Sequence, residues 1–335
     1  MDKKAKNILH YSFWAVVAVV LVYFCLRSVD WTQFGEALRH CRWEYVLLAM
    51  LFGVLGLIVR GLRWRRLLLP LDASTSAVTS INAYGIGNAV NLVVPRAGDV
   101  VRVGYVINRS AQDQEGRRLV GFNKGLGTVV MDRGLDVVLA IIIAVVLMFV
   151  EREHFGSWLM GSFSGADSKS NIWWLLIGVL AFLVGIIILL WALRKKGGMW
   201  SKVWQFIAGI GHGIASIRHM HKGWLFVLDT ILIWIFLWGT SASIVWALQD
   251  IEQFASLTLA DTFLIMIIGC ITTAIPVPGG FGAYHGIVAG ALVGIWGIPL
   301  SLAMIYATLN HESQVVVNAV CGIVTYIHES FIRKP

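Results

Sequence analysis

The chain has 335 residues, of which 58% are hydrophobic and only 14% are charged, and its formal net charge at pH 7 is +8. This composition excludes an ordinary soluble protein of the same length, which would carry far more charge. The positive charges lie in short loops between apolar runs, which is typical of cytoplasmic membrane loops rather than of a nucleic-acid-binding surface. Four scattered cysteines without a CxxC pair predict neither a disulfide framework nor a metal site, and no cofactor motif is present.

Several apolar runs reach the length of about 20 residues that a helix needs to cross a bilayer. We expect membrane-spanning helices at about 8–27, 43–60, 125–150, 172–193, 223–248 and 302–328. Two further apolar segments, near 76–94 and 258–299, are interrupted by proline and glycine. The predicted fold class is therefore all-α, a polytopic bundle of membrane helices.

The basic loops predict the topology, because arginine and lysine are enriched in cytoplasmic loops. Residues 60–66, 96–124 and 194–222 are rich in these side chains and are expected in the cytoplasm. Residues 151–170 are not basic overall and 249–253 carry only acids, so both are expected outside. Counting the crossings places both termini in the cytoplasm.

The count of membrane crossings also predicts that each of the two interrupted segments is a re-entrant hairpin. A single crossing at 76–94 would place the basic stretch 96–124 outside the cytoplasm. If 302–328 crosses once and the C-terminus is cytoplasmic, 258–299 must begin and end outside. Irregular backbone is tolerated at membrane depth where protein or a water-filled cavity satisfies it. The alternative is a continuous helix with a proline kink. The predicted turning points contain Pro95, Gly98, Pro276, Pro278, Gly279, Gly280 and Gly282.

The two breaks resemble each other. "VVPRAGDVVR" begins at Val93 and "AIPVPGGFGA" begins at Ala274, and about 35 residues after each lies an apolar segment with embedded polar groups. We interpret this as an inverted internal repeat, with chance similarity as the alternative. The halves, about 1–170 and 171–335, would together form one integral membrane domain. Many transporters place their substrate between such repeats.

Three charges lie inside the predicted span at 125–150. Asp132 and Asp136 share a helix face at i,i+4, and Arg133 can pair with Asp136. Each charge at the bilayer centre costs on the order of 2.5–3.5 kcal/mol, so such residues are candidates for a functional site. The alternatives are a local structural ion pair and a helix end near the cytoplasmic interface.

The first break supplies Arg96, Asp99 and Arg102 around the start of a short helix. Free N–H groups at a helix N-terminus favour an anion, and arginine can bind phosphate with two parallel hydrogen bonds. We therefore expect these three residues to bind substrate. The alternative is a cytoplasmic loop whose arginines only follow the positive-inside bias.

Polar side chains also recur beside both breaks. Tyr84, Asn88 and Asn91 lie at i, i+4 and i+7, which predicts a polar stripe on a cavity wall. Asn310 belongs to a second polar group, "NHESQ", in the last predicted span, and is expected in the same wall.

His285 and Glu312 complete the predicted substrate-binding residues. His285 follows the second break, where it could bind an anion, although a lone histidine is commonly structural. Glu312 could neutralise Arg133 across the pseudo-symmetric centre of the repeat.

"PRAGDVVR", "DRGLD" and "PVPGGFGAYH", in this order, resemble the transmembrane region of the lysylphosphatidylglycerol synthase/flippase family. The resemblance covers nearly the whole chain and implies an integral membrane domain with re-entrant segments that moves lipids between leaflets. The positions that match the family motifs are Pro95, Arg96, Gly98, Asp99, Arg102, Asp132, Arg133, Asp136, Pro276, Pro278, Gly279, Gly280 and Gly282. The chain departs from the family pattern at His285, where an acid is usual.

The expected function is that of a flippase-like transporter which moves a phosphate-bearing, in some cases aminoacylated, lipid headgroup between the leaflets of a bacterial inner membrane. A membrane-embedded transferase or an accessory protein acting on a lipid-linked substrate is the alternative. The chain ends at Pro335 without the family's soluble aminoacyl-transferase domain, so we expect no synthase activity. The expected partner is a membrane phospholipid or a lipid-linked substrate, with a separate synthase as a further partner and no nucleic acid. The sequence does not predict whether the protein forms oligomers.

Overall fold

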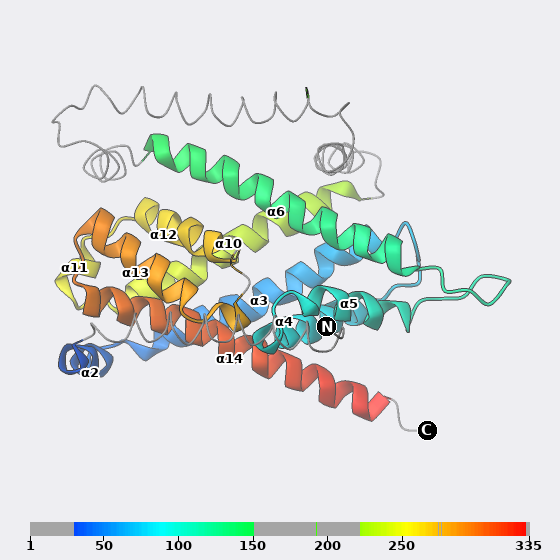
Figure 1. The fold of residues 1–335 in the computed structure, drawn as a ribbon, viewed down its shortest axis with the longest axis horizontal. Coiled ribbons are helices and arrows are strands. Elements are labelled where there is room, and N and C mark those ends of the chain that lie inside the picture. The colour runs from blue at the N-terminus through cyan, green and yellow to red at the C-terminus, as the bar shows by residue number, and fades with distance from the viewer. Residues whose placement is uncertain (1–29, 151–191, 193–221, 274, 276, 333–335) are drawn as a thin grey trace, which may run out of the picture. The chain divides into compact units, whose positions relative to one another are not determined.

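The computed structural model describes residues 30–150, 192, 222–273, 275 and 277–332. These residues form α2 (Trp31–Arg39), α3 (Trp43–Leu68), α4 (Ala77–Val93), α5 (Ala97–Ile107), α6 (Phe122–Val150), α10 (Gly223–Ala247), α11 (Glu252–Ala255), α12 (Leu259–Thr272), η3 (Pro278–Gly280), α13 (Ala283–Trp296) and α14 (Leu300–Ile332), as Figure 1 shows. The all-α prediction is confirmed. The predicted span at 8–27, and that at 172–193 apart from residue 192, lie outside the described residues.

The chain divides into two compact units, residues 1–129 with 227–335 and residues 130–226. Each unit is described by itself. The boundary falls within α6, and the first unit contains the helices on either side of both predicted breaks. The predicted division into halves near residue 170 stays a prediction.

Within the described residues, three stretches are long and apolar enough to cross a membrane: α3, α10 and residues 278–296. The third is not one continuous helix, because Gly279 and Gly282 have φ angles of 59° and 77°. Only the 14 residues of α13 are continuously helical there. They span about 21 Å, less than the roughly 30 Å of a bilayer's hydrocarbon core.

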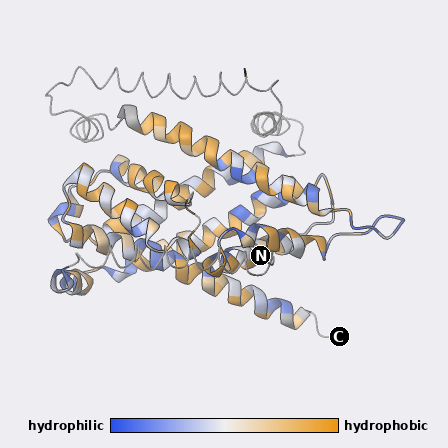
Figure 2. Ribbon diagram, viewed as in Figure 1, coloured by the Kyte–Doolittle hydropathy of each residue, from blue (hydrophilic) through white to orange (hydrophobic). Residues whose placement is uncertain are grey.

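The helices follow the apolar runs of the sequence, as Figure 2 shows for α6, most of which is hydrophobic with hydrophilic residues among the apolar ones. The loop between α5 and α6 is hydrophilic in the same figure. The predicted span 43–60 extends further, to Leu68, so that Arg65 and Arg66 lie in the last turn of α3. Positive side chains are favourable at this position because they face the negative end of the helix dipole.

Helices α4 and α5 form a helical hairpin that turns at Val94–Arg96. Pro95 cannot continue the hydrogen-bond ladder of α4, and Arg96 adopts a left-handed backbone conformation with φ 66°. Just beyond the turn, the Gly98 N–H donates to Asn91 Oδ1 at 2.8 Å. A Cβ on Gly98 would lie 1.8 Å from the carbonyl oxygen of Gly87, so the two helices approach to a distance that only glycine permits.

Helices α12 and α13 form a second hairpin, with η3 in the break between them. Thr258 and Asp261 cap the start of α12 reciprocally, each side chain accepting from the other's backbone N–H. The Trp296 indole N–H at the end of α13 donates to Asp261 Oδ1 at 2.8 Å. This bond joins the two ends of the hairpin away from its tip.

Within the first unit, the open ends of the two hairpins lie at opposite ends, and their tips meet. The first opens at the end of α3, where Ser110 Oγ donates to Asp72 Oδ2 at 2.8 Å. The second opens at the end of the unit where α3 begins (Figure 1), and there the Arg42 backbone N–H donates to the carbonyl of Ala247, the last residue of α10, at 2.9 Å. At the tips, the Arg96 guanidinium donates to the Thr273 carbonyl at 2.5 Å. No membrane is present in the structure, so the re-entrant position of the hairpins and the inverted repeat stay predictions.

Helix α14 packs against α3, α4 and α13 and so contacts both hairpins. Its first half lies in the core, where Ala303, Ile305 and Tyr306 have no exposed surface. Its second half exposes apolar side chains such as Val320 and Ile323. Apolar side chains exposed on this scale indicate contact with lipid.

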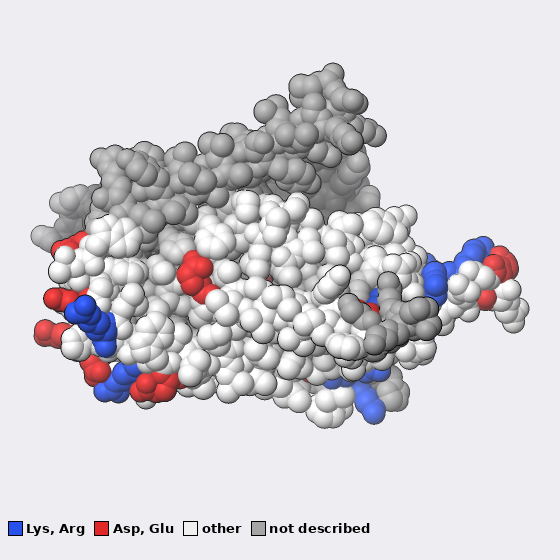
Figure 3. Space-filling view, turned by 90° about the horizontal axis from the view of Figure 1, so that it is seen from below, with Lys and Arg blue, Asp and Glu red and all other residues white. Residues whose placement is uncertain are grey.

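Charged side chains gather toward the two ends of the face seen in Figure 3, with one acidic patch between them and otherwise uncharged surface. Asp250 and Glu252 are exposed beside the start of α3. Arg117, Arg118 and Lys124 are exposed beyond the end of α5. The basic and acidic loops therefore lie at opposite ends of α3, as the crossing count requires.

Candidate functional site

The middle of α14 is polar in a helix that is otherwise largely apolar. Asn310, His311, Glu312, Ser313 and Gln314 follow one another there, ten residues or more from the helix start. Asn310 and His311 reach the second hairpin, and Gln314 Nε2 donates to the carbonyl of Ala49 in α3 at 3.2 Å. The polar segment is thus held by the helices around it.

His285, His311 and Glu312 form what we call the His–Glu cluster. Glu312 Oε1 lies 3.1 Å from His311 Nδ1 and 3.6 Å from His285 Nε2. The side chains of the histidines are 9% and 10% exposed, and that of Glu312 is 40% exposed. The structure therefore brings together the two predicted residues His285 and Glu312 and adds His311, whose ring centre lies 5.0 Å from that of His285.

The glycine-rich break positions His311. The His311 Nε2 atom lies 2.8 Å from the Gly279 carbonyl oxygen. Gly279 and Gly280 have φ angles of 59° and 81°, in the left-handed region that favours glycine. A Cβ on Gly280 would lie 3.2 Å from His311 Nε2. The motif "PVPGGFG" therefore turns a backbone carbonyl toward α14 at close range.

A buried chain of hydroxyl and amide groups lies next to the cluster. Asn310 Nδ2 donates to Tyr284 Oη at 2.6 Å and to Tyr306 Oη at 3.4 Å. The Tyr306 hydroxyl is 2.6 Å from Ser241 Oγ. The predicted wall residue Asn310 is thus buried in a network that joins α13, α14 and α10.

Arg102, a predicted phosphate ligand, lies inside the first hairpin. Its guanidinium carbon is 4.8 Å from the ring centre of Trp64 and 4.4 Å from that of Tyr84, and its side chain pairs with Asp99 at 3.2 Å. Both rings offer a cation–π contact. Tyr84 and Arg102 are 1% exposed, so this arrangement packs α3, α4 and α5 together.

Arg96 is exposed at the junction of the hairpin tips. The neighbouring stripe residues are engaged in the packing: Asn88 Nδ2 donates to Asn318 Oδ1 at 3.0 Å, and Asn91 holds Gly98. The predicted stripe thus joins α4 to α14 and to α5.

Asp132, Arg133 and Asp136 lie on α6, which is one continuous helix, so both acids share a face as expected. Each of the three makes a polar or electrostatic contact. They belong to the second unit, whereas Glu312 belongs to the first. The expected pairing of Arg133 with Glu312 stays a prediction.

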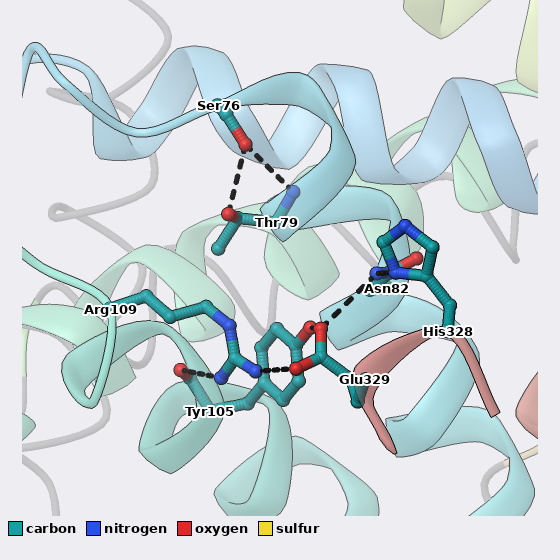
Figure 4. Close-up of polar contacts among 7 residues, drawn as sticks. All are labelled: Ser76, Thr79, Asn82, Tyr105, Arg109, His328 and Glu329. Carbon is teal, nitrogen blue, oxygen red and sulfur yellow. Dashed lines mark hydrogen bonds and ion pairs between the residues drawn. The ribbon is translucent and has the colours of Figure 1, made fainter. Parts of the chain in front are cut away.

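A second polar cluster, at the far end of α14, did not emerge from the sequence (Figure 4). Glu329 accepts hydrogen bonds from Tyr105 and Arg109 of the first hairpin. Asn82 Nδ2 lies 3.4 Å from the same carboxylate and 3.1 Å from His328 Nδ1. These bonds fasten α14 to the open end of the first hairpin. The only signal in the sequence was a lone acid near the chain end.

Two surface hollows, of about 380 and 510 Å³, lie at the ends of the first unit. The first is lined by residues such as Arg42 and Asp250, and the second by residues of the loop before α6. Neither hollow borders the hairpin tips. The water-filled chamber between the tips stays a prediction.

Long apolar helices, an exposed apolar surface and charges at opposite ends define this chain as an integral membrane protein of the polytopic α-helical class. The chain belongs to the family described as the lysylphosphatidylglycerol synthase TM region, whose sequence pattern matches residues 13–322. Comparison with curated proteins and with solved structures found no match. The family expected from the three motifs is confirmed.

Proposed function

We propose that the protein is a flippase-like transporter which moves a phosphate-bearing lipid headgroup between the two leaflets of its membrane. The observation that carries this proposal is the meeting of the two hairpin tips beside the polar middle of α14. A polar headgroup that crosses hydrocarbon unaided loses its hydration. Polar groups held at the same depth as the apolar helix surfaces would lower that barrier, while the acyl tails stay in the bilayer.

Arg96 is the residue best placed to attract the phosphate. Its guanidinium is exposed at the tip junction, and its hydrogen bond to Thr273 uses one of five N–H donors. Guanidinium binds phosphate with two parallel hydrogen bonds. Asp132, Arg133 and Asp136 belong to the second unit and stay predicted substrate-binding residues. Arg102 would act by holding the first hairpin, since its guanidinium is enclosed between two rings.

The direction of insertion is part of the proposal. The basic end of α3 and the loop that contains Arg117 and Arg118 would face the cytoplasm, together with both chain termini, in a bacterial inner membrane. The end with Asp250 would face outward. We propose transport without a chemical step on the lipid.

Leaflet-resolved transport in proteoliposomes tests this function. Vesicles with purified protein and fluorescent phosphatidylglycerol should exchange the lipid between leaflets faster than empty vesicles. The Arg96→Ala variant should be about tenfold slower, as expected for the loss of a charge-assisted hydrogen bond. Arg117→Ala, which removes a loop arginine whose side chain is 70% exposed, is the matched control and should not change the rate. Equal rates for empty and protein-bearing vesicles would overturn the proposal.

A further inference from the structure

The His–Glu cluster poses an electrostatic problem that a bound cation would solve. A backbone carbonyl can only accept, so His311 must carry its proton on Nε2 to bond Gly279 at 2.8 Å. In the neutral ring, Nδ1 then has a lone pair, and it faces the carboxylate of Glu312 at 3.1 Å. Two acceptors at this distance repel each other unless a cation, either a proton or a metal ion, lies between them.

His285 is a third group that contacts the Glu312 carboxylate. Its Nε2 lies 3.6 Å from the same Glu312 oxygen. Its Nδ1 is buried and has no hydrogen-bond partner among the residues that the structure describes. Buried polar atoms are normally satisfied, so Nδ1 calls for a water, while Nε2 is the ring atom that can bind an ion beside Glu312.

We propose that His285, His311 and Glu312 bind a divalent transition-metal ion, with Zn²⁺ as the fitting example. One ligand atom from each side chain lies within 4.8 Å of the other two. Nitrogen and carboxylate ligands about 2.0–2.1 Å from a tetrahedral Zn²⁺ are about 3.3 Å apart. The distances of 3.1 and 3.6 Å to Glu312 lie on either side of this value, and the two histidine nitrogens, which lie within 4.8 Å of each other, must close to it by side-chain rotation.

The surroundings of His311 are those of a metal ligand. Metal-bound histidines typically donate their second ring N–H to a carbonyl or carboxylate, which fixes the ring and the tautomer. The Gly279 carbonyl has this role for His311. The Tyr284 and Phe281 rings lie 5.2 and 5.1 Å from the His311 ring, between centres, and limit its movement.

The ligand chemistry indicates the class of ion. Imidazole nitrogens favour zinc, copper, iron and nickel, whereas Mg²⁺ and Ca²⁺ prefer oxygen ligands. Three protein ligands leave one position of a tetrahedral ion open, as in catalytic rather than structural zinc sites. One carboxylate leaves a divalent ion with net positive charge, so an anion is favoured in the open position. The proposal departs from the sequence analysis, which predicted no metal, and it does not rest on lipid transport.

The test measures metal content and affinity on the full-length protein, purified in detergent with a tag that contains no histidine. We expect one Zn²⁺ per chain by elemental analysis after removal of free metal. Co²⁺ should replace it and give a visible absorption band from a low-symmetry site. His285→Gln, His311→Gln and Glu312→Gln should each weaken binding by about 100-fold or more, since even outer partners of metal ligands contribute 10–100-fold.

His40→Gln is the matched control, because His40 is exposed at the end of α2 and is remote in sequence from the cluster. Its affinity should equal that of the unchanged protein. Size-exclusion profiles of all variants separate lost binding from lost folding, and the Co²⁺ spectrum of the unchanged protein tests the site without any variant. Absence of bound metal would leave a shared proton as the only cation and overturn the proposal. So would metal that remains at full affinity in the three cluster variants.

Discussion

The two hairpins reverse the direction of the chain in different ways. The α4–α5 hairpin turns within three residues and closes on itself: Asn91 caps Gly98, and Arg102 fills the space between two aromatic rings. The α12–α13 hairpin has a longer break, residues 273–282, and directs a backbone carbonyl outward to His311.

This difference gives the hairpins different roles: the first mainly supports the fold, and the second positions the candidate site. Apart from Arg96 at the tip, the polar groups of the first hairpin are used within its own packing or to hold α14, as Tyr105 and Arg109 do by donating to Glu329. The second hairpin positions the His–Glu cluster, where a buried histidine nitrogen has no partner among the described residues. Apart from Arg96, we therefore expect substitutions in the first hairpin to affect mainly stability, and those in the second to affect mainly metal binding.

The largest effect should come from Gly98→Ala. The added Cβ would lie 1.8 Å from the Gly87 carbonyl oxygen, so the two helices must separate. We expect a loss of about 3 kcal/mol or more in the free energy of unfolding, at the upper end for overpacking. Thermal unfolding in detergent measures it.

Gly104→Ala in the same helix is the control, because no atom lies within 4 Å of its added Cβ. It should be neutral or slightly stabilising. Equal unfolding temperatures for the two variants would contradict the close packing of the first hairpin.

Gly280→Ala should have a smaller effect on stability and a clear effect on the cluster. A left-handed backbone costs a non-glycine residue roughly 1–2 kcal/mol, and the added Cβ would lie 3.2 Å from His311 Nε2. We expect that loss of stability together with weaker Zn²⁺ binding, measured by unfolding and by metal titration. Gly290→Ala, whose Cβ meets open space on α13, should change neither. Unchanged Zn²⁺ affinity in Gly280→Ala would contradict the role of the second hairpin in positioning the His–Glu cluster.

The bridge between the tips can be separated from its backbone strain by two substitutions of Arg96. Both Arg96→Ala and Arg96→Gly remove the hydrogen bond to Thr273, but only glycine relieves the left-handed backbone at φ 66°. Arg96→Gly should therefore be more stable than Arg96→Ala by about 1 kcal/mol. Chemical or thermal unfolding of the pair measures this difference. A less stable glycine variant would show that the turn adopts another conformation.

The smallest effect is a pH dependence at the open end of the first hairpin. Burial alone would raise the pKa of Asp72, but hydrogen bonds from Ser74, the Ala111 N–H and Ser110 outweigh it and hold the pKa below 3.8. The unfolded chain therefore takes up the proton more readily than the folded protein. The stabilisation is present above the unfolded pKa and is lost as the pH falls through the folded pKa.

Asp72→Asn checks this sign. The variant cannot lose a charge at this position, so the difference in unfolding temperature between it and the unchanged protein should shrink as the pH is lowered from about 6 toward 3. A difference that stays constant over this range would contradict the lowered pKa.

Much of the fold followed from local features of the sequence. Apolar runs predicted α3, α6, α10 and α14, and the proline and glycine residues marked both hairpin turns. The predicted end of α3 was early because the apolar run stops at Arg60, whereas arginine is well tolerated in a last helical turn. The order of the three motifs also indicated the family.

The sequence by itself determined where helices form and break, because hydrophobicity, missing N–H groups and glycine's backbone freedom act over a few residues. Only the tertiary structure decided which polar side chains meet. His311 reaches a carbonyl 32 positions away, and Arg102 lies between rings of two other helices. Such neighbours depend on the rotation and height of each helix against the next. These are fixed by packing over the whole unit, not by any short stretch of residues.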